Sequence, residues 1–123
     1  MAGNPVFGRR VRDIREAKVK TDPRFTLRSF AKAVGISPTF LSKVERGEFD
    51  PPRPEKIIKM AEVLGIDADE LLALANKVDP KLSRIIMDEP KAMADFLRTA
   101  RDKKLTAEDI QKLTEKIRKQ VRS

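Results

Sequence analysis

The 123-residue chain contains no cysteine, histidine, tyrosine or tryptophan, and these absences exclude several classes of protein. Without cysteine there is no disulfide framework and no thiol chemistry. Without histidine the chain lacks the usual general base and the usual zinc ligand. The carboxylates that remain are scattered among lysines and arginines. We therefore predict that the protein is not an enzyme and holds no metal or cofactor.

Long apolar segments are also missing from the sequence. No apolar run approaches the roughly 20 residues that span a bilayer, and the N-terminus lacks the apolar core of a signal peptide. The sequence therefore predicts a cytoplasmic protein without a membrane partner.

The charge of the chain is unevenly distributed. The net charge is +8. Residues 1–46 hold 11 basic and 4 acidic side chains, whereas residues 47–78 hold 4 basic and 7 acidic ones. A basic half of this kind is typical of a surface that binds a polyanion, although solvated basic surfaces are common too.

The segment 26–48 is predicted to form two short amphipathic helices joined by a glycine turn. Apolar residues recur at helical spacing from Phe30 to Val34, and Gly35 stands where this helix must end. Ser37 is suited to cap the second helix, which carries polar and basic side chains opposite its apolar stripe. Such a pair can present its second helix to a groove of duplex DNA.

At these residues the chain resembles the Xre, or phage lambda repressor-like, helix-turn-helix family. The resemblance covers roughly residues 6–76 and runs in register through five helices. The matching positions are Phe30-Ala31, Gly35-Ile36-Ser37, Phe40-Leu41-Ser42-Lys43-Val44-Glu45-Arg46-Gly47, Pro51-Pro52, Ile57, Ala61, Leu64-Gly65-Ile66 and Leu71-Leu72.

The resemblance implies an all-α fold, with a five-helix lambda repressor-like DNA-binding domain over residues 1–78. It also implies a sequence-specific regulator that binds double-stranded DNA and represses its own promoter or that of a neighbouring gene. An RNA-binding regulator is not supported, because the chain lacks the usual aromatic stacking platform.

The family pattern further implies which side chains meet DNA. Thr39 and Lys43 match positions that touch base edges, while Pro38 occupies another such position but cannot hydrogen-bond through its side chain. Phe40 either packs beneath the following loop or meets thymine methyl groups, and Arg53 either approaches the minor groove or is solvated. The full predicted set is Arg28, Lys32, Ser37, Thr39, Phe40, Ser42, Lys43, Arg46 and Arg53.

Two features depart from the family pattern. The connection over residues 19–25 is several residues longer than the usual turn, and we expect Phe25 to turn back into the core. Leu27 stands where many relatives place a glutamine that grips phosphate, so this contact moves to Arg28 or is lost.

The remaining elements of the domain are expected as follows. Residues 1–5 are a loose leader, and the first helix runs from Val6 to about Lys18. Its arginines lie largely off the apolar face, which is formed by Val6, Phe7, Val11 and Ile14. A fourth helix covers about 54–64 and a fifth about 68–78.

Residues 79–123 are predicted to form a small helical segment of three short helices. Their apolar stripes cannot be buried among themselves, because so few residues make a poor core. We predict a homodimer that binds an inverted repeat; the alternatives are folding back onto the first domain, or docking a toxin or a metallopeptidase of the ImmA/IrrE type. The predicted interface consists of Leu82, Ile85, Ile86, Met93, Phe96, Leu97, Ile110, Leu113, Ile117 and Val121.

Overall fold

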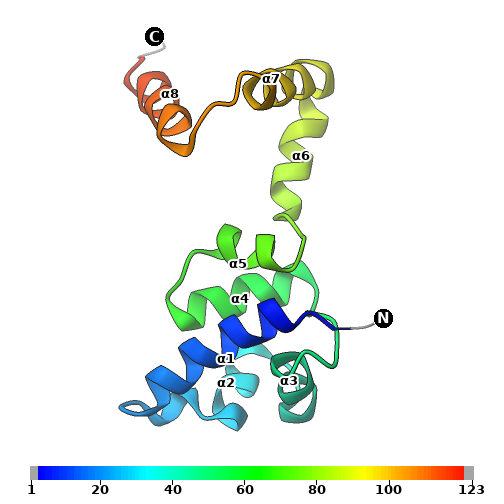
Figure 1. Cartoon of the computed structure of the whole chain (residues 1–123), viewed down its shortest axis with the longest axis vertical. Coiled ribbons are helices and arrows are strands. Elements are labelled where there is room, and N and C mark those ends of the chain that lie inside the picture. The colour runs from blue at the N-terminus through cyan, green and yellow to red at the C-terminus, as the bar shows by residue number, and fades with distance from the viewer. Residues whose placement is uncertain (1–2, 121–123) are drawn as a thin grey trace. The chain divides into compact units, whose positions relative to one another are not determined.

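The computed structural model describes residues 3–120, which form eight α-helices and one 3₁₀ turn and contain no β-strand (Figure 1). The all-α fold class is therefore confirmed. In chain order the elements are α1 (Pro5–Val19), η1 (Pro23–Phe25), α2 (Leu27–Val34), α3 (Pro38–Glu45), α4 (Pro54–Leu64), α5 (Ala68–Leu74), α6 (Pro80–Asp88), α7 (Pro90–Asp102) and α8 (Ala107–Lys119).

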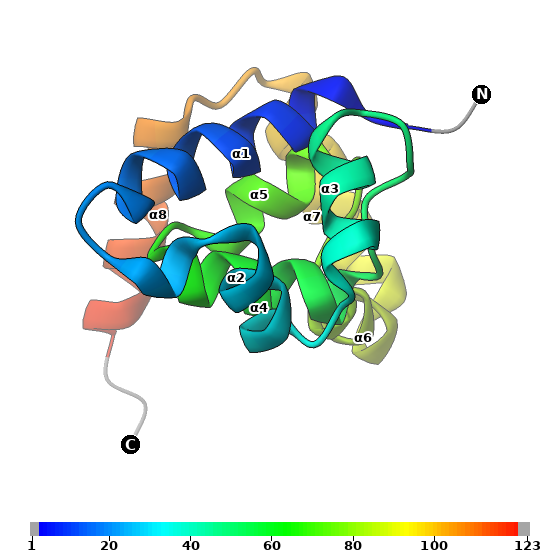
Figure 2. The ribbon, with the colours of Figure 1, turned by 90° about the horizontal axis from the view of Figure 1, so that it is seen from below.

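The chain forms two compact units, which divide between Ser83 and Arg84. In the first unit α1 packs against α3 and α5, α2 packs against α3 and α4, and α4 packs against α5 (Figure 2). One hydrophobic core lies between these helices and is built from Phe7, Val11, Phe25, Phe30, Ala31, Val34, Leu41, Val44, Ile57, Met60, Ala61, Leu64, Leu71, Leu72 and Ala75. The long first connection thus returns Phe25 to the core, as predicted.

Local sequence signals set most helix ends of this unit. The Thr26 hydroxyl accepts from the Ser29 amide at 3.2 Å and caps α2. The Asp67 carboxylate does the same for α5 by accepting from the Glu70 amide at 3.0 Å. Gly65 ends α4 in the left-handed conformation (φ 74°), in which glycine carries no Cβ penalty.

Residues 3–5 are not a loose leader, and for them this prediction was wrong; residues 1 and 2 lie outside the described residues. The Asn4 carboxamide caps α1 through the Phe7 amide at 3.0 Å and donates to the Leu74 carbonyl at 2.8 Å. The Gly3 amide donates to the Asp50 carboxylate at 2.8 Å. The Asn4 cap on Phe7 is local, but Leu74 and Asp50 are distant in sequence, so no local pattern could have shown these two contacts.

Two further expectations about helices are corrected. On α1 the buried face includes Gly8 and Arg15, whereas Val6 is exposed. Helix α5 ends at Leu74 and does not reach Val78, because Asn76 adopts a positive φ of 58° that breaks the helical path.

The second unit contains most of α6, with α7 and α8. Thr106 and Asp109 form a reciprocal capping box at the start of α8. None of the residues of α6, α7 and α8 is buried. Within residues 3–120, no helix is long and apolar enough to cross a membrane.

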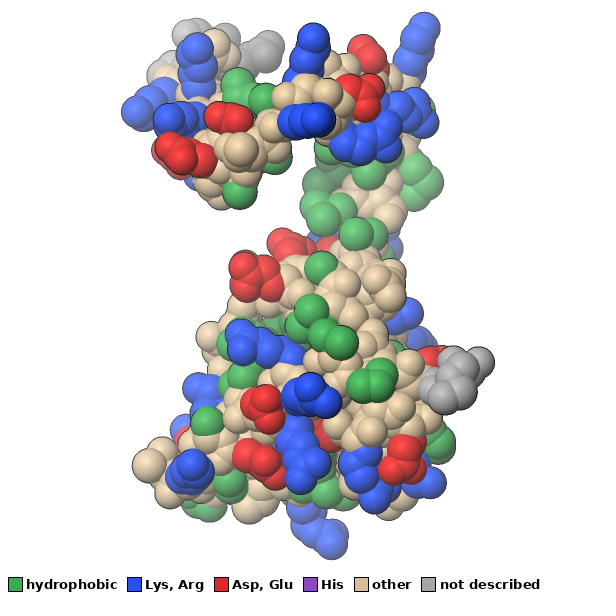
Figure 3. Space-filling model, viewed as in Figure 1, with side chains coloured by type: hydrophobic (Ala, Val, Ile, Leu, Met, Phe, Trp, Pro, Cys, Tyr) green, Lys and Arg blue, Asp and Glu red, His purple; other side chains and the backbone are tan. Residues whose placement is uncertain are grey.

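The predicted interface side chains differ in how exposed they are. Ile86 and Met93 are half-buried, and Val121 lies outside the described residues. Figure 3 shows hydrophobic side chains on the surface of α6. The exposed members of the predicted set are Leu82, Ile85, Phe96, Leu97, Ile110, Leu113 and Ile117.

Candidate nucleic-acid interface

The turn between α2 and α3 holds the two helices in a defined geometry. Gly35 adopts φ 87°, and its amide bonds back to the Ala31 carbonyl at 2.9 Å. The Ile36 amide donates to the same carbonyl at 3.0 Å, and the Ser37 hydroxyl caps α3 by accepting from the Phe40 amide at 3.0 Å. The predicted glycine stop and serine cap are both present, so the start of α3 is fixed relative to α2.

Burial of one face of α3 leaves its opposite face to solvent. Leu41, Val44 and Glu45 are buried. Thr39 lies exposed in the first turn, beside the Ser37 cap. Amide groups at a helix N-terminus attract anions, so this end of α3 suits a phosphate or a base-edge acceptor.

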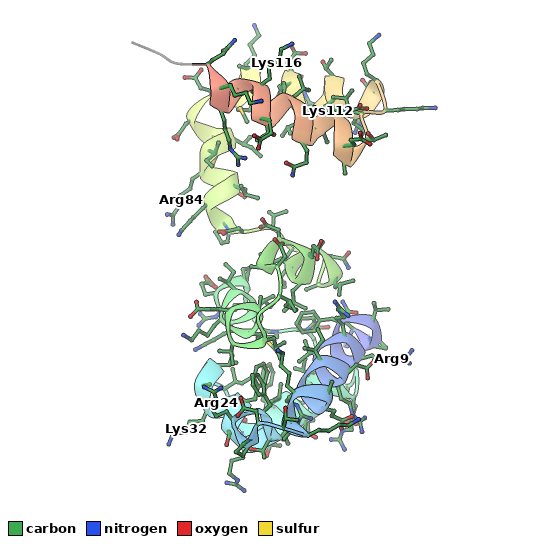
Figure 4. The ribbon with its side chains drawn as sticks, turned by 90° about the vertical axis from the view of Figure 1, so that its left-hand side faces the viewer. Arg9, Arg24, Lys32, Arg84, Lys112 and Lys116 are labelled. Carbon is green, nitrogen blue, oxygen red and sulfur yellow. The ribbon has the colours of Figure 1, made fainter. Side chains whose placement is uncertain are left out.

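Basic side chains from several elements lie around this face. Lys and Arg side chains project from the lower end of the first unit, where α2 and α3 lie (Figure 3). Arg28, Lys32 and Arg53 are exposed, and within residues 3–120 none of them forms an ion pair. Figure 4 shows Lys32 projecting away from the helices. These cations are therefore available to a polyanion.

Arg24 is a basic side chain of η1 that is held locally. Its guanidinium forms an ion pair with Asp22 at 2.7 Å. The hydrogen bond from Arg24 lowers the pKa of the Asp22 carboxyl and raises that of Arg24, so the pair stays charged at neutral pH.

Lys43 of α3 and Arg46, the C-cap residue of that helix, are held differently by the loop that follows. Arg46 forms an ion pair with Glu48 at 3.0 Å between Nε and Oε2. The Lys43 ammonium lies 5.0 Å from the centroid of the Phe49 ring. Phe40, which is half-buried against the core, lies 6.1 Å from Phe49 between ring centroids. Phe40 thus packs beside the loop.

A shallow groove opens beside these aromatic residues. Its volume is about 580 Å³. It is lined by Ile36, Phe40, Phe49, Asp50, Pro51, Pro52, Arg53 and Lys56. The structure thus brings Phe40 and Arg53 to one groove, while Arg28 and Lys32 extend from α2.

The inner side of α3 is anchored by a buried ion pair that sequence reasoning missed. Arg15 donates to both carboxylate oxygens of Glu45, at 2.7 and 2.8 Å, and to the Phe25 carbonyl at 3.1 Å. The hydrogen bond with Glu45 raises the pKa of Arg15 against the opposing effect of burial. The Arg15 guanidinium is therefore charged throughout the acid and neutral range.

A usable signal for this pair was present in the sequence. Arg15 lies four residues after Val11 and eight after Phe7, on the buried stripe of α1. Glu45 likewise lies four residues after Leu41. A basic and an acidic residue that both fall on apolar faces are candidates for a buried pair, because each charge needs a partner.

Residues 3–120 contain no group of three or more acidic side chains arranged to hold a metal ion. The interface is built instead from a helix N-terminus, hydroxyl groups and cations. Such groups position and read nucleic acid.

Comparison with known proteins identifies one matching family model and two related sequences. The model of the helix-turn-helix domain family matches residues 6–74. The chain is 33% identical over 72 residues to the uncharacterized HTH-type transcriptional regulator RghRB of Bacillus subtilis, a match over 58% of this chain and 48% of RghRB. It is 42% identical over 66 residues to the uncharacterized HTH-type transcriptional regulator YazB of the same organism, over 54% of this chain and 87% of YazB.

The chain therefore spans about half the length of RghRB and most of YazB. Among solved structures, the clp gene regulator ClgR from Corynebacterium glutamicum aligns over 84% of this chain and 95% of its own, with 24% sequence identity and a TM-score of 0.48.

The family match and the two sequence relatives support a DNA-binding transcriptional regulator and not an enzyme. They agree with the resemblance found in the sequence. Because the family model matches more than half of the chain, the protein belongs to the helix-turn-helix domain family.

Proposed function

We propose that the protein is a homodimeric repressor that binds a specific inverted repeat in double-stranded DNA through α3. In this proposal residues 1–78 bind DNA, residues 79–123 hold the dimer, and the protein acts on DNA in the cytoplasm. The observation that carries the proposal is the capped α2–α3 turn, which presents a helix with a polar and basic outer face.

Sequence is read from the outer face of α3. The Thr39 methyl group can contact a thymine methyl, and the Lys43 ammonium can donate to the O6 and N7 acceptors of guanine in the major groove. Ser37 lies beside the helix N-terminus, where amide groups attract phosphate. Phe40 packs beside the loop that follows α3.

We assign contacts with the DNA phosphate backbone to the cations near α3. Arg28 and Lys32 on α2, together with Arg53 at the start of α4, are exposed. Ser42 and Arg46 lie toward the end of α3 and are suited to phosphate. Contacts of this class supply affinity and register and carry no sequence information directly.

Lys43→Ala and Arg46→Ala form a matched pair that separates base reading from phosphate binding. Lys43→Ala is expected to cost about 1–3 kcal/mol at the selected site and to relax preference at one base pair. Arg46→Ala should weaken binding to all sequences alike. Because one phosphate contact is lost, the slope of the logarithm of the binding constant against the logarithm of the salt concentration should become shallower by about one. Fluorescence anisotropy on the selected site and on scrambled DNA, at several salt concentrations, distinguishes the two effects.

Equal weakening of both DNAs by Lys43→Ala would reject the base-reading role of Lys43. Lys59→Ala on α4 is a suitable control, because Lys59 is paired with Glu62 at 3.2 Å and lies outside the proposed surface.

The apolar residues of α6, α7 and α8 support the dimer. The Phe96 side chain is 54% exposed and that of Ile117 is 64% exposed. Burying such side chains against a second copy removes apolar surface from water, at roughly 25 cal/mol per Å². An inverted repeat presents two half-sites about one helical turn apart, and a two-fold pair can offer one reading helix to each.

Ile117→Asp is expected to shift the protein from dimer to monomer, because a carboxylate would be buried in the proposed interface. Val6→Asp is the matched control: Val6 on α1 is also 64% exposed, but lies outside the interface. Sedimentation velocity of both variants, and of a fragment ending at Val78, measures the association state. A fragment that dimerises like the full chain, or an Ile117→Asp variant that remains dimeric, contradicts the assignment.

Selection of bound sites from a random duplex library tests the function as a whole. An enriched inverted repeat, reduced to a half-site in the fragment ending at Val78, supports the dimeric repressor. If the full chain is monomeric, the apolar face of the tail is left to a different protein partner, such as a toxin or a metallopeptidase.

A further inference from the structure

The loop after α3 contacts two cations, Lys43 of the helix and Arg46 at its C-cap, by different kinds of interaction. Glu48 holds Arg46 through a carboxylate, at 3.0 Å. The adjacent Phe49 holds Lys43 through its ring, 5.0 Å from the ammonium to the ring centroid. Two successive loop residues thus determine where the two outer cations of the proposed reading helix lie.

Hydrogen bonds hold the backbone that carries the Phe49 ring against α3. The Glu48 and Phe49 amides both donate to the Lys43 carbonyl, at 2.8 and 3.2 Å. On its far side the loop is held by the Asp50 carboxylate, which accepts from the Gly3 amide at 2.8 Å. Lys43 and Phe49 are therefore linked twice, through a backbone hydrogen bond and through the contact of the ammonium with the ring.

The Phe40 side chain of α3 packs against the Phe49 ring. Phe40 lies three residues before Lys43 and so on a neighbouring part of the helix surface. Its ring meets that of Phe49 at a centroid distance of 6.1 Å and an interplanar angle of 51°. Phe49 is still 42% exposed, and Lys43 is only half-buried.

The phenyl ring of Phe49 is suited to hold the Lys43 ammonium while leaving it free to hydrogen-bond to a base. A carboxylate accepts hydrogen bonds from a cation and competes with DNA phosphate for its N–H donors, as Glu48 does at Arg46 in the free protein. The face of a phenyl ring attracts the charge without occupying the N–H donors with a strong acceptor. A free lysine side chain carries considerable rotamer entropy, which a contact must offset before it binds. Holding Lys43 over a ring reduces that cost and keeps its donors free.

We propose that Phe49 is a positioning residue that determines sequence specificity by holding the Lys43 ammonium in the orientation that reads a base. This inference rests on the proposed DNA-binding function. Phe49 contributes through Lys43, so its effect should be confined to the base pair that Lys43 reads.

The test combines a conservative series with a double-mutant cycle. Phe49→Leu keeps an apolar side chain and removes the ring, whereas Phe49→Tyr retains the ring. Binding is measured for both variants, for Lys43→Ala and for Lys43→Ala/Phe49→Leu, on the selected site and on versions changed at each base pair. Thermal unfolding of each variant confirms that it is folded.

The expected result is specific to one base pair. Phe49→Leu should reduce discrimination there by about two- to fivefold, the range of an exposed cation–π contact. Phe49→Tyr should restore it, and Phe49→Leu should have no further effect when Lys43 is already alanine. An unchanged or improved discrimination, or additive effects in the double variant, would overturn the inference.

A measurement without DNA tests the positioning separately. In the free protein the Lys43 Hε protons should show an upfield ring-current shift in the NMR spectrum. The shift should persist in Phe49→Tyr and disappear in Phe49→Leu. Its absence from the unsubstituted protein rejects the positioning role even if Lys43 reads a base. If the shift is present and library selection enriches no site, the proposed function fails, and the specificity role of Phe49 fails with it.

Discussion

Glu45→Ala is expected to lower the free energy of unfolding by about 3–5 kcal/mol, the usual cost of removing one partner from a buried ion pair. The side chains of Arg15 and Glu45 are only 9% and 4% exposed, so solvent cannot replace the lost carboxylate. Arg15 would keep the Phe25 carbonyl as a hydrogen-bond acceptor but would have no counter-charge. Domains of this size have roughly 5–15 kcal/mol of stability in total, so the effect is large. Urea denaturation at neutral pH measures it.

Two variants show whether the burial of the pair is the cause. Glu16→Ala removes one partner of an exposed pair with Arg12, in which both side chains are 50% exposed. That change should cost less than about 1 kcal/mol. Arg15→Met/Glu45→Met removes both charges and should recover much of the stability lost in Glu45→Ala. A loss below about 1 kcal/mol in Glu45→Ala would contradict the buried role of the pair.

Gly8→Ala is expected to lower the free energy of unfolding by about 3 kcal/mol, at the upper end of the usual cost of overpacking. A Cβ atom at Gly8 would lie 2.2 Å from the Val44 carbonyl oxygen and 2.7 Å from that of Glu45. Both contacts are with the backbone of α3, so no side-chain rotation can relieve them. Helix α1 would have to move away from the proposed reading helix.

The sign of this effect distinguishes it from helix propensity. Alanine in place of glycine normally stabilises a helix interior by roughly 1 kcal/mol. Ala17→Gly, at an exposed position of the same helix, should therefore destabilise the protein by about 1 kcal/mol. Chemical denaturation of both variants gives the comparison, and a Gly8→Ala variant as stable as the unsubstituted protein would show that α1 and α3 can separate at no cost.

Much of the candidate interface could be predicted because its signals are local. A hydroxyl at an N-cap and a glycine at a helix end act over three or four residues, so Thr26, Gly35 and Ser37 were recognisable in the sequence. The same holds for the capping box of α8. The roles of Thr39 and Lys43 in DNA reading were inferred from the family resemblance and remain predictions.

The missed residues share a different property. Arg15 meets Glu45 across 30 positions, and the Gly3 amide meets Asp50 across 47. Phe49 is only six residues from Lys43, but its ring reaches the ammonium because the loop folds back onto the Lys43 carbonyl. Helical periodicity places Arg15 and Glu45 on buried faces, but it does not show that the two residues meet. No periodicity or composition distinguishes Gly3, Asp50 and Phe49 from ordinary surface positions.

The sequence by itself determined the all-α class, the helix-turn-helix unit and the positions at which most of its helices begin and end. These depend on backbone hydrogen bonds and dihedral preferences, which act between neighbours in the chain. Only the tertiary structure decided that α1 approaches α3 at Gly8, that a buried ion pair anchors α3 from within, and that Phe49 lies against Lys43. Those features depend on close packing between distant segments, where distance and desolvation determine the energy and sequence separation does not.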